Sequence, residues 1–185
     1  ALPISWEQKG LLDSHHISDI VLDASNPDVA VVGALGHLYS DNAERGIFKT
    51  TDGGDTWEKT LFINEKTGII SLAEAPDNPS VMYATAWERE RMAWDFVGSG
   101  ENSGIYKSTD GGKTFEHMGL ENTHQIGRVI AHPTNPDIAY VAAAGHLWGY
   151  SGERGLFKTT DGGNSWEKMT NGLPTDEKTG AIDLI

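Results

Sequence analysis

The sequence predicts an all-β fold in which three repeats each supply four short antiparallel strands. The first observation is a turn motif that occurs three times in nearly the same letters, at residues 50–57, 108–115 and 159–166. The second is an Asn-Pro turn that precedes an apolar run in each repeat, at residues 26, 78 and 135. A repeat of 51 to 58 residues in a strand-rich sequence is typical of the blades of a β-propeller. We therefore expect a propeller segment of about three blades.

The four strands of a blade follow in order from the first repeat. Alternating polarity predicts a first strand, proline presets the next turn, and a Val- and Ala-rich run predicts a buried second strand. The strands are expected at residues 17–23, 29–35, 46–50 and 56–62. The chain is then one partial domain, residues 1–185. Its expected parts are a fourth strand of a preceding blade (1–12), blades at 13–62, 63–119 and 120–170, and the first strand of a further blade (171–185).

The recurring turn has a structural interpretation. Its two glycines permit positive φ, its aspartate accepts hydrogen bonds from the turn's own N–H groups, and its aromatic residue packs between blades. The residues assigned to this role are Asp52, Gly54, Trp57, Asp110, Gly112, Phe115, Asp161, Gly163 and Trp166. The alternative is a catalytic carboxylate or a calcium ligand. A calcium loop uses several acidic ligands, whereas each of these turns offers one.

The three turns fit the pattern Ser/Thr-x-Asp-x-Gly-x-Thr/Ser-Trp/Phe and so resemble the Asp-box, or bacterial neuraminidase repeat. The text NPDIAYVAAAGHLWGYSGERGLFKTTDGGNSWEK, residues 135–168, resembles sortilin-type propellers of bacterial exported proteins, which are often labelled glycosyl hydrolases. This resemblance implies a periplasmic or secreted location. Asp-box propellers include sialidases, xyloglucanases, peptide-binding sorting receptors and photosystem assembly factors, so the fold does not decide the function.

The same resemblance implies that ligands bind on the face away from the Asp-boxes, where the loops between the second and third strands lie. The first and third of these loops correspond at an offset of 109 residues, but the second, residues 87–100, differs. Aromatic faces cover sugar rings or apolar groups, and charged groups fix orientation. The expected ligand-binding residues here are Trp87, Arg89, Arg91, Trp94 and, in the third loop, Trp148. Alternatively, these side chains pack the loops onto neighbouring blades.

Four histidines recur at the same offset, and each pair is expected to meet at the top of one blade. The pairs are His15 with His37 and His124 with His146. They are further ligand-binding candidates, because two imidazoles can bind a metal or a polar ligand. The sequence identifies no third ligand, so we expect neither a metal site nor a cofactor. Alternatively, the histidines fix the loops by hydrogen bonds.

The composition limits the kinds of partner that we expect the chain to bind. The formal net charge is −13 and no basic cluster occurs, which argues against nucleic acid. There is no cysteine, and no apolar run approaches the roughly 18 residues of a membrane span. Because the predicted strands do not close a ring, we expect the remaining blades of a parent protein, or another copy of the chain, as a partner.

Three functions remain open. The first is the binding of a glycan or peptide, and the second is a part in glycoside hydrolysis. For the second, the nominated acids are Glu88, Glu90 and Asp95. The third is a structural propeller segment without a ligand of its own.

Overall fold

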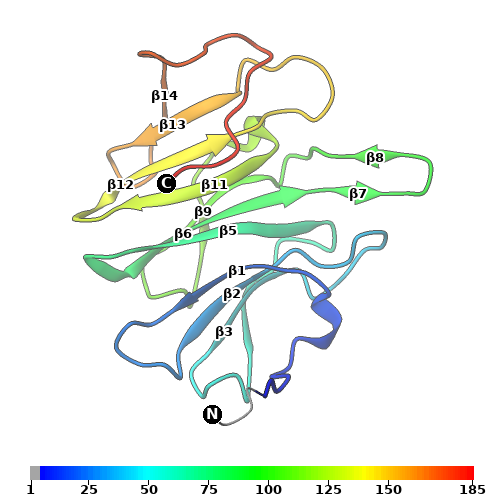
Figure 1. Cartoon of the computed structure of the whole chain (residues 1–185), viewed down its shortest axis with the longest axis vertical. Helices are drawn as coiled ribbons and strands as arrows, with labels where there is room; N and C mark the ends of the chain where they lie inside the picture. Colours follow the sequence, from blue (N-terminus) through cyan, green and yellow to red (C-terminus); the bar gives the residue numbers. More distant parts are fainter. Residues whose placement is uncertain (1–4) are drawn as a thin grey trace.

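The computed structural model describes residues 5–185 and contains three four-stranded antiparallel sheets that follow one another along the chain (Figure 1). The first sheet consists of β1 (Ile17–Leu22), β2 (Ala30–Ala34), β3 (Gly46–Thr50) and β4 (Glu58–Leu61). The second consists of β5 (Thr67–Ala75), β6 (Asn78–Glu88), β9 (Gly104–Ser108) and β10 (Glu116–His117). The third consists of β11 (Ile126–His132), β12 (Asn135–Ala143), β13 (Gly155–Thr159) and β14 (Glu167–Met169). The all-β fold class is confirmed, and the strands of the first repeat lie within two residues of their expected bounds.

Each sheet is a meander in which sequential strands are neighbours, with the order β1-β2-β3-β4 in the first case. The turns between first and second strands therefore lie at the same end as the Asp-boxes. The loops between second and third strands lie at the opposite end, here called the loop face, on the right-hand side of Figure 1. None of the described residues forms a helix long and apolar enough to cross a membrane.

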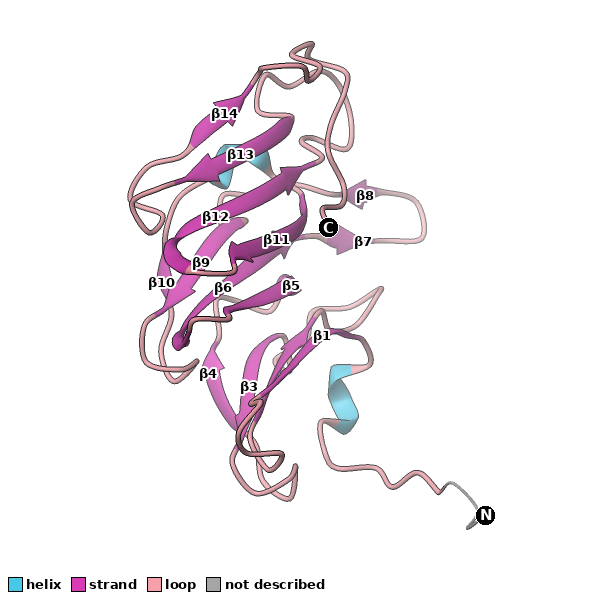
Figure 2. Ribbon diagram, turned by 60° about the vertical axis from the view of Figure 1, so that its left-hand side comes forward, coloured by secondary structure: helices cyan, strands magenta, loops and turns pink. Residues whose placement is uncertain are grey.

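The second loop of the loop face folds differently from our expectation. Residues 87–100 were expected to lack strands, but β6 extends to Glu88 and is followed by a hairpin of β7 (Glu90–Arg91) and β8 (Phe96–Val97). The N–H of Met92 donates to the carbonyl of Asp95 at 2.8 Å, which closes a tight turn. The hairpin projects well beyond the sheets (Figures 1 and 2).

The two ends of the chain also differ from expectation. Residues 5–11 form no strand, and the rest of that expected strand, residues 1–4, lies outside the described residues. The 3₁₀-helix η1 (Leu12–Ser14) follows, and η2 (Glu121–Thr123) occupies the matching place before β11. Residues 171–185 also form no strand, although the N–H of Ala181 donates to the carbonyl of Ala143 at 3.0 Å. Each end lacks the neighbouring strand, within the described chain, that a sheet ladder requires.

The core lies between the sheets. Ile47 of the first sheet and Ile69 and Met82 of the second belong to one buried cluster, onto which Phe115 packs. Tyr83 of the second sheet and Val141 of the third belong to the other, onto which Trp166 packs. Strands buried on both faces explain the continuous apolar runs of the second and third strands.

Polar contacts also cross between sheets. Ser18 donates its hydroxyl to the carbonyl of Ile69 at 2.6 Å, and the N–H of Leu72 donates to Asp19 at 2.9 Å. These contacts fix the position of β1 against β5.

Candidate functional site

The carboxylates of the Asp-box aspartates accept hydrogen bonds from residues of their own turns. Asp52 Oδ1 accepts the hydroxyl of Thr50 at 2.8 Å and the N–H of Thr56 at 2.9 Å, while Oδ2 accepts the Thr56 hydroxyl at 2.6 Å. Asp110 and Asp161 make the same bonds. The side-chain and backbone bonds of Thr56 lower the pKa of Asp52 to about 2. A carboxylate used in this way is a turn-forming group rather than a free acid or base.

The glycines and aromatic residues of the boxes complete the turns. Gly54 and its counterparts, Gly112 and Gly163, have φ of 89°, 80° and 95°, a region that glycine adopts without strain. The preceding glycine of each box donates its N–H to a backbone carbonyl near the start of the second strand, as Gly53 does to that of Asp28 at 2.9 Å. Trp57 donates its indole N–H to the carbonyl of Lys9 at 2.6 Å.

Arginine side chains shape the first and third loops of the loop face. Arg45, which is 2% exposed, donates to the carbonyls of Leu35, His37 and Ser40 at 3.0, 2.9 and 3.2 Å. Arg154 binds the carbonyls of the matching residues Ala144, His146 and Gly149. Each arginine is therefore a clamp that holds its loop closed.

A cleft of about 370 Å³ lies between the first loop and the hairpin. Tyr39 of the first loop, and Arg89, Arg91 and Met92 around β7, line it. The Arg91 guanidinium lies 5.6 Å from the ring centres of both Tyr39 and Phe96. Such cation–π contacts preorganise an aromatic surface beside a fixed charge.

Trp87 is covered by the hairpin, whereas Arg89 lines the cleft. Trp87 is 9% exposed and donates its indole N–H to the carbonyl of Gly98 at 3.0 Å. The Arg89 guanidinium lies 5.2 Å from the Trp87 ring, and Arg89, which is 8% exposed, is one of the residues that line the cleft. Burial, together with the positive charges of Arg45 and Arg91, lowers the pKa of Arg89 to about 10. β6 continues through Trp87 and the ring is buried against the hairpin, which is the packing arrangement given above as the alternative for this side chain.

Other aromatic side chains of the loop face are exposed. Trp94 at the hairpin tip is 84% exposed, Trp148 is 74%, Tyr150 is 68% and Tyr39 is 63%. The ammonium of Lys178 lies 5.2 Å from the Tyr150 ring. Sequence reasoning missed Tyr39 and Tyr150, although both stand in the same loops as the predicted residues.

Each of the three nominated acids is engaged by other groups of the chain. Glu88 accepts the side-chain N–H of Asn102 at 2.8 Å, and Glu90 forms an ion pair of 2.7 Å with Lys66. Asp95 accepts the N–H of Phe96 at 2.8 Å within the hairpin turn. The arrangement does not present any two of them as a pair across the cleft, because Glu90 alone of the three lines it.

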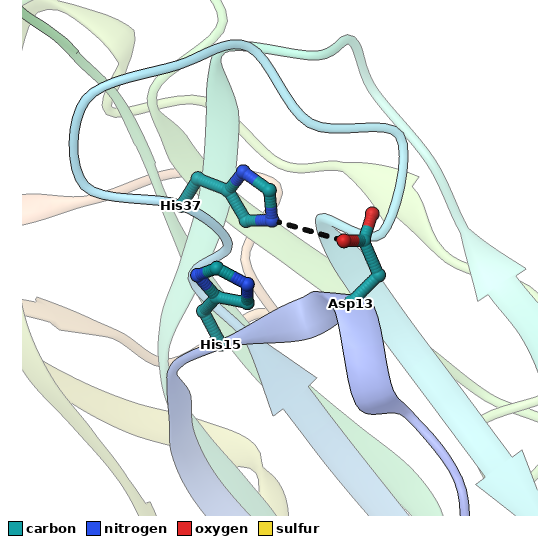
Figure 3. Close-up of side chains that lie close together, drawn as sticks. All are labelled: Asp13, His15 and His37. Carbon is teal, nitrogen blue, oxygen red and sulfur yellow. Dashed lines mark hydrogen bonds and ion pairs between the residues drawn. The ribbon is translucent and has the colours of Figure 1, made fainter.

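Both predicted histidine pairs meet. The ring centres of His15 and His37 are 3.8 Å apart, and those of His124 and His146 are 3.6 Å apart. Burial, and then the proximity of His146, lower the pKa of His124. At the first pair, Asp13 of η1 lies close enough that one ligand atom from each of the three side chains falls within 4.8 Å of the others (Figure 3). Sequence reasoning missed Asp13. The one sequence difference that could have drawn attention to it is that the matching position of the third repeat holds Asn122 instead of an acid.

The known proteins that this chain resembles include β-propellers, and their sequence identity to it is low. No family model matches it. It is 27% identical over 172 residues to a Neosartorya fischeri protein named "Probable oligoxyloglucan-reducing end-specific xyloglucanase", covering 88% of this chain and 18% of that protein.

Solved structures show the same fold. An ancestral GH74 enzyme matches 89% of this chain with a TM-score of 0.62 and 19% identity, and 20% of that chain is covered. The GH74 xyloglucanase from Xanthomonas campestris matches 83% of this chain and 21% of its own, with a TM-score of 0.59 and 15% identity. YCF48 from Cyanidioschyzon merolae matches 89% and 42%, with a TM-score of 0.56 and 17% identity. The chain is thus similar to part of a β-propeller and spans about a fifth of the length of its GH74-type relatives.

Proposed function

We propose that the loop face binds a glycan of the xyloglucan type, as part of an extracytoplasmic propeller to which further blades contribute. The observation that carries the proposal is the set of exposed aromatic side chains on one face: Tyr39, Trp94, Trp148 and Tyr150. Exposed tryptophan and tyrosine rings offer flat apolar surfaces that match the faces of sugar rings. Large aromatics left this exposed are typical of an interaction surface.

The cleft between the first loop and the hairpin adds polar groups to these aromatic surfaces. Arg91 lies against Tyr39, and Glu90 of the hairpin and Asp41 and Ser40 of the first loop line the same cleft and supply acceptors. A neutral glycan with many hydroxyl groups takes both donors and acceptors, while an acidic surface does not repel it. The name of the relative at 27% identity supports xyloglucan as the first ligand to test.

A share in hydrolysis is the second candidate function, and that relative's name is the observation that favours it. Glycoside hydrolysis needs two carboxyl groups on either side of the scissile bond. Glu88 and Asp95 form hydrogen bonds within their own loop, and Glu90 is paired with Lys66 of the loop before β5. Hydrolysis also requires two free acids across the bound glycan, whereas binding requires only the surface described here.

The test is isothermal titration calorimetry of the chain with xyloglucan oligosaccharides, cello-oligosaccharides and a panel of unstructured peptides. Binding of the oligosaccharides that is lost when Trp148 and Trp94 are both replaced by alanine supports the proposal. Binding of peptides alone assigns the surface to a peptide ligand instead. Release of reducing ends during the titration, abolished by Glu90→Gln, would favour the second candidate.

A further inference from the structure

A cluster of three metal-binding side chains lies outside the aromatic cleft. Asp13 belongs to η1, His15 follows η1 directly, and His37 begins the first loop after β2. The Nε2 atom of His37 lies 3.3 Å from Oδ1 of Asp13, and the two imidazole rings stack with centres 3.8 Å apart. Figure 3 shows the three side chains converging from two separate segments of the chain.

The donor set suits a transition-metal ion. Two imidazoles and one carboxylate match three-ligand zinc sites, in which Zn–N distances are about 2.0–2.1 Å and Zn–O distances about 2.0–2.2 Å. Ligand atoms around such an ion lie roughly 3.3–3.5 Å from one another. The His37–Asp13 separation is already 3.3 Å, and all three ligand atoms fall within 4.8 Å. Because imidazole lone pairs lie in the ring plane, the exposed His15 ring must turn out of its stacked position before both rings can bind one ion.

Neighbouring side chains already orient two of the ligands. Nδ1 of His37 shares a hydrogen bond of 2.8 Å with the Ser40 hydroxyl. In the tautomer whose Nδ1–H donates to Ser40, Nε2 presents a lone pair to the Asp13 carboxylate, and two acceptors at that distance need a proton or a cation between them. Asn42 donates to the other carboxylate oxygen, Oδ2, at 3.1 Å. Such outer partners fix tautomer and orientation in metal sites.

The third repeat provides an internal comparison. His124 and His146 also meet, 109 residues further along the chain, with their ring planes tilted by 40° to each other. Asn122 replaces Asp13 there, and Gly149 and Ser151 replace Ser40 and Asn42. Within the described residues, no third histidine or carboxylate joins that pair to form a three-ligand group. The paired histidines therefore belong to the repeated fold, whereas the carboxylate and its supporting side chains are special to the first repeat.

We propose that Asp13, His15 and His37 bind a divalent transition-metal ion of the zinc class, with a further coordination position open to solvent. The ion would tie the segment that precedes β1 to the loop that follows β2. Because Asp13 and His15 are exposed, the open position faces outward and is accessible to water or to an oxygen atom of a ligand.

The test uses the whole chain without a polyhistidine tag, treated with chelator and titrated with Zn²⁺ in competition with a chromogenic chelator. The expected result is one Zn²⁺ per chain. Asp13→Asn, which copies the third repeat, and His15→Ala should each weaken binding by at least about tenfold. His124→Ala is the matched control and should leave the affinity unchanged. Far-UV circular dichroism and Tm of each metal-free variant verify that the fold is retained.

A gain-of-site variant tests the same idea in the opposite direction. Asn122→Asp should add a second, weaker Zn²⁺ equivalent, because the supporting Ser40 and Asn42 have no counterparts there. The proposal is overturned if the wild-type chain binds no Zn²⁺, if Asp13→Asn binds as tightly as wild type, or if His124→Ala weakens binding as much as His15→Ala.

Discussion

The ammonium group of Lys49 in β3 donates a hydrogen bond of 2.6 Å to the carbonyl oxygen of Gly111, in the Asp-box of the next sheet. Lys107 in β9 repeats the relationship with Gly162 at 2.9 Å. The third strand of one blade thus holds the box of the following blade. Lys158 occupies the same strand position in the third sheet, but the described residues contain no following sheet whose box it could hold.

We expect Lys107→Met to lower the free energy of unfolding by about 1.5 kcal/mol, because the substitution removes a charged donor and leaves the Gly162 carbonyl without it. The Lys107 side chain is 12% exposed and also lies 5.5 Å from the ring centre of Tyr83. Urea unfolding measures the change. Lys158→Met is the matched control and should have a much smaller effect. Equal losses for the two variants would show that the contact between blades contributes nothing.

The fold was predictable from sequence because its signals are local and repeated. The two glycines and the aspartate of each box specify a turn by themselves, and the apolar runs specify strands buried on both faces. The hairpin was not predictable from these signals, since each of its strands, β7 and β8, has only two residues, too few for an alternating pattern of polar and apolar side chains. Its formation depends on packing: the Trp87 ring, buried at its base, meets Phe96 edge-on with centres 6.0 Å apart.

The candidate site was predictable in part, for a similar reason. The repeat offset placed His15 with His37, because equivalent loop positions in two blades have equivalent surroundings. The offset gave no reason to single out Asp13, because its position beside the histidines is set by the 3₁₀-helix η1, which the sequence did not predict. Likewise, sequence could not separate buried Trp87 from exposed Trp94, because the extent of β6 decides which of the two is covered.

We expect Asp110→Ala to lower the free energy of unfolding by about 1–2 kcal/mol, because the N–H groups of Lys113 and Thr114 lose their acceptor. Burial opposes the ionisation of Asp110, yet its hydrogen bonds with Thr114, Ser108 and Lys113 keep its pKa below the usual value. Urea unfolding gives the stability, and titration of the folded variant with oligosaccharide gives the affinity. Normal stability combined with lost affinity would move the box from a structural to a functional role.

The stability of the chain should decrease in acid. The hydrogen bonds of the turns lower the pKa of Asp52 and of Asp161 from 3.8 to about 2. A carboxyl group whose pKa is lower in the folded state stabilises the fold above its unfolded pKa, and that contribution is lost as pH falls through the folded value. The urea midpoint should therefore fall between about pH 4 and pH 2. Asp161→Asn should be less stable than wild type at pH 6 and lose less of its stability over that interval; an unchanged slope would contradict the assignment.

The first sheet has an apolar outer face that should drive association. Ile20 and Leu22 of β1 are 57% and 63% exposed. Uncovered apolar side chains on a blade promote contact with another blade or another copy of the chain. Ile20→Lys should shift the sedimentation profile towards the monomer at high protein concentration. Val97→Lys, which alters a residue of similar exposure on the hairpin, is the control and should leave the profile unchanged.

Trp94→Ala should weaken oligosaccharide binding by about tenfold, or on the order of 1–2 kcal/mol, because the change removes the most exposed ring of the loop face. The ring lies at a hairpin tip outside the sheets, so Tm should change little. Trp6→Ala, which removes an equally exposed ring from the segment preceding β1, is the matched control. Trp94→Phe should recover most of the affinity, since a flat ring remains. If Trp94→Ala binds as wild type does, or if Trp6→Ala loses as much, the hairpin tip is not part of the ligand surface.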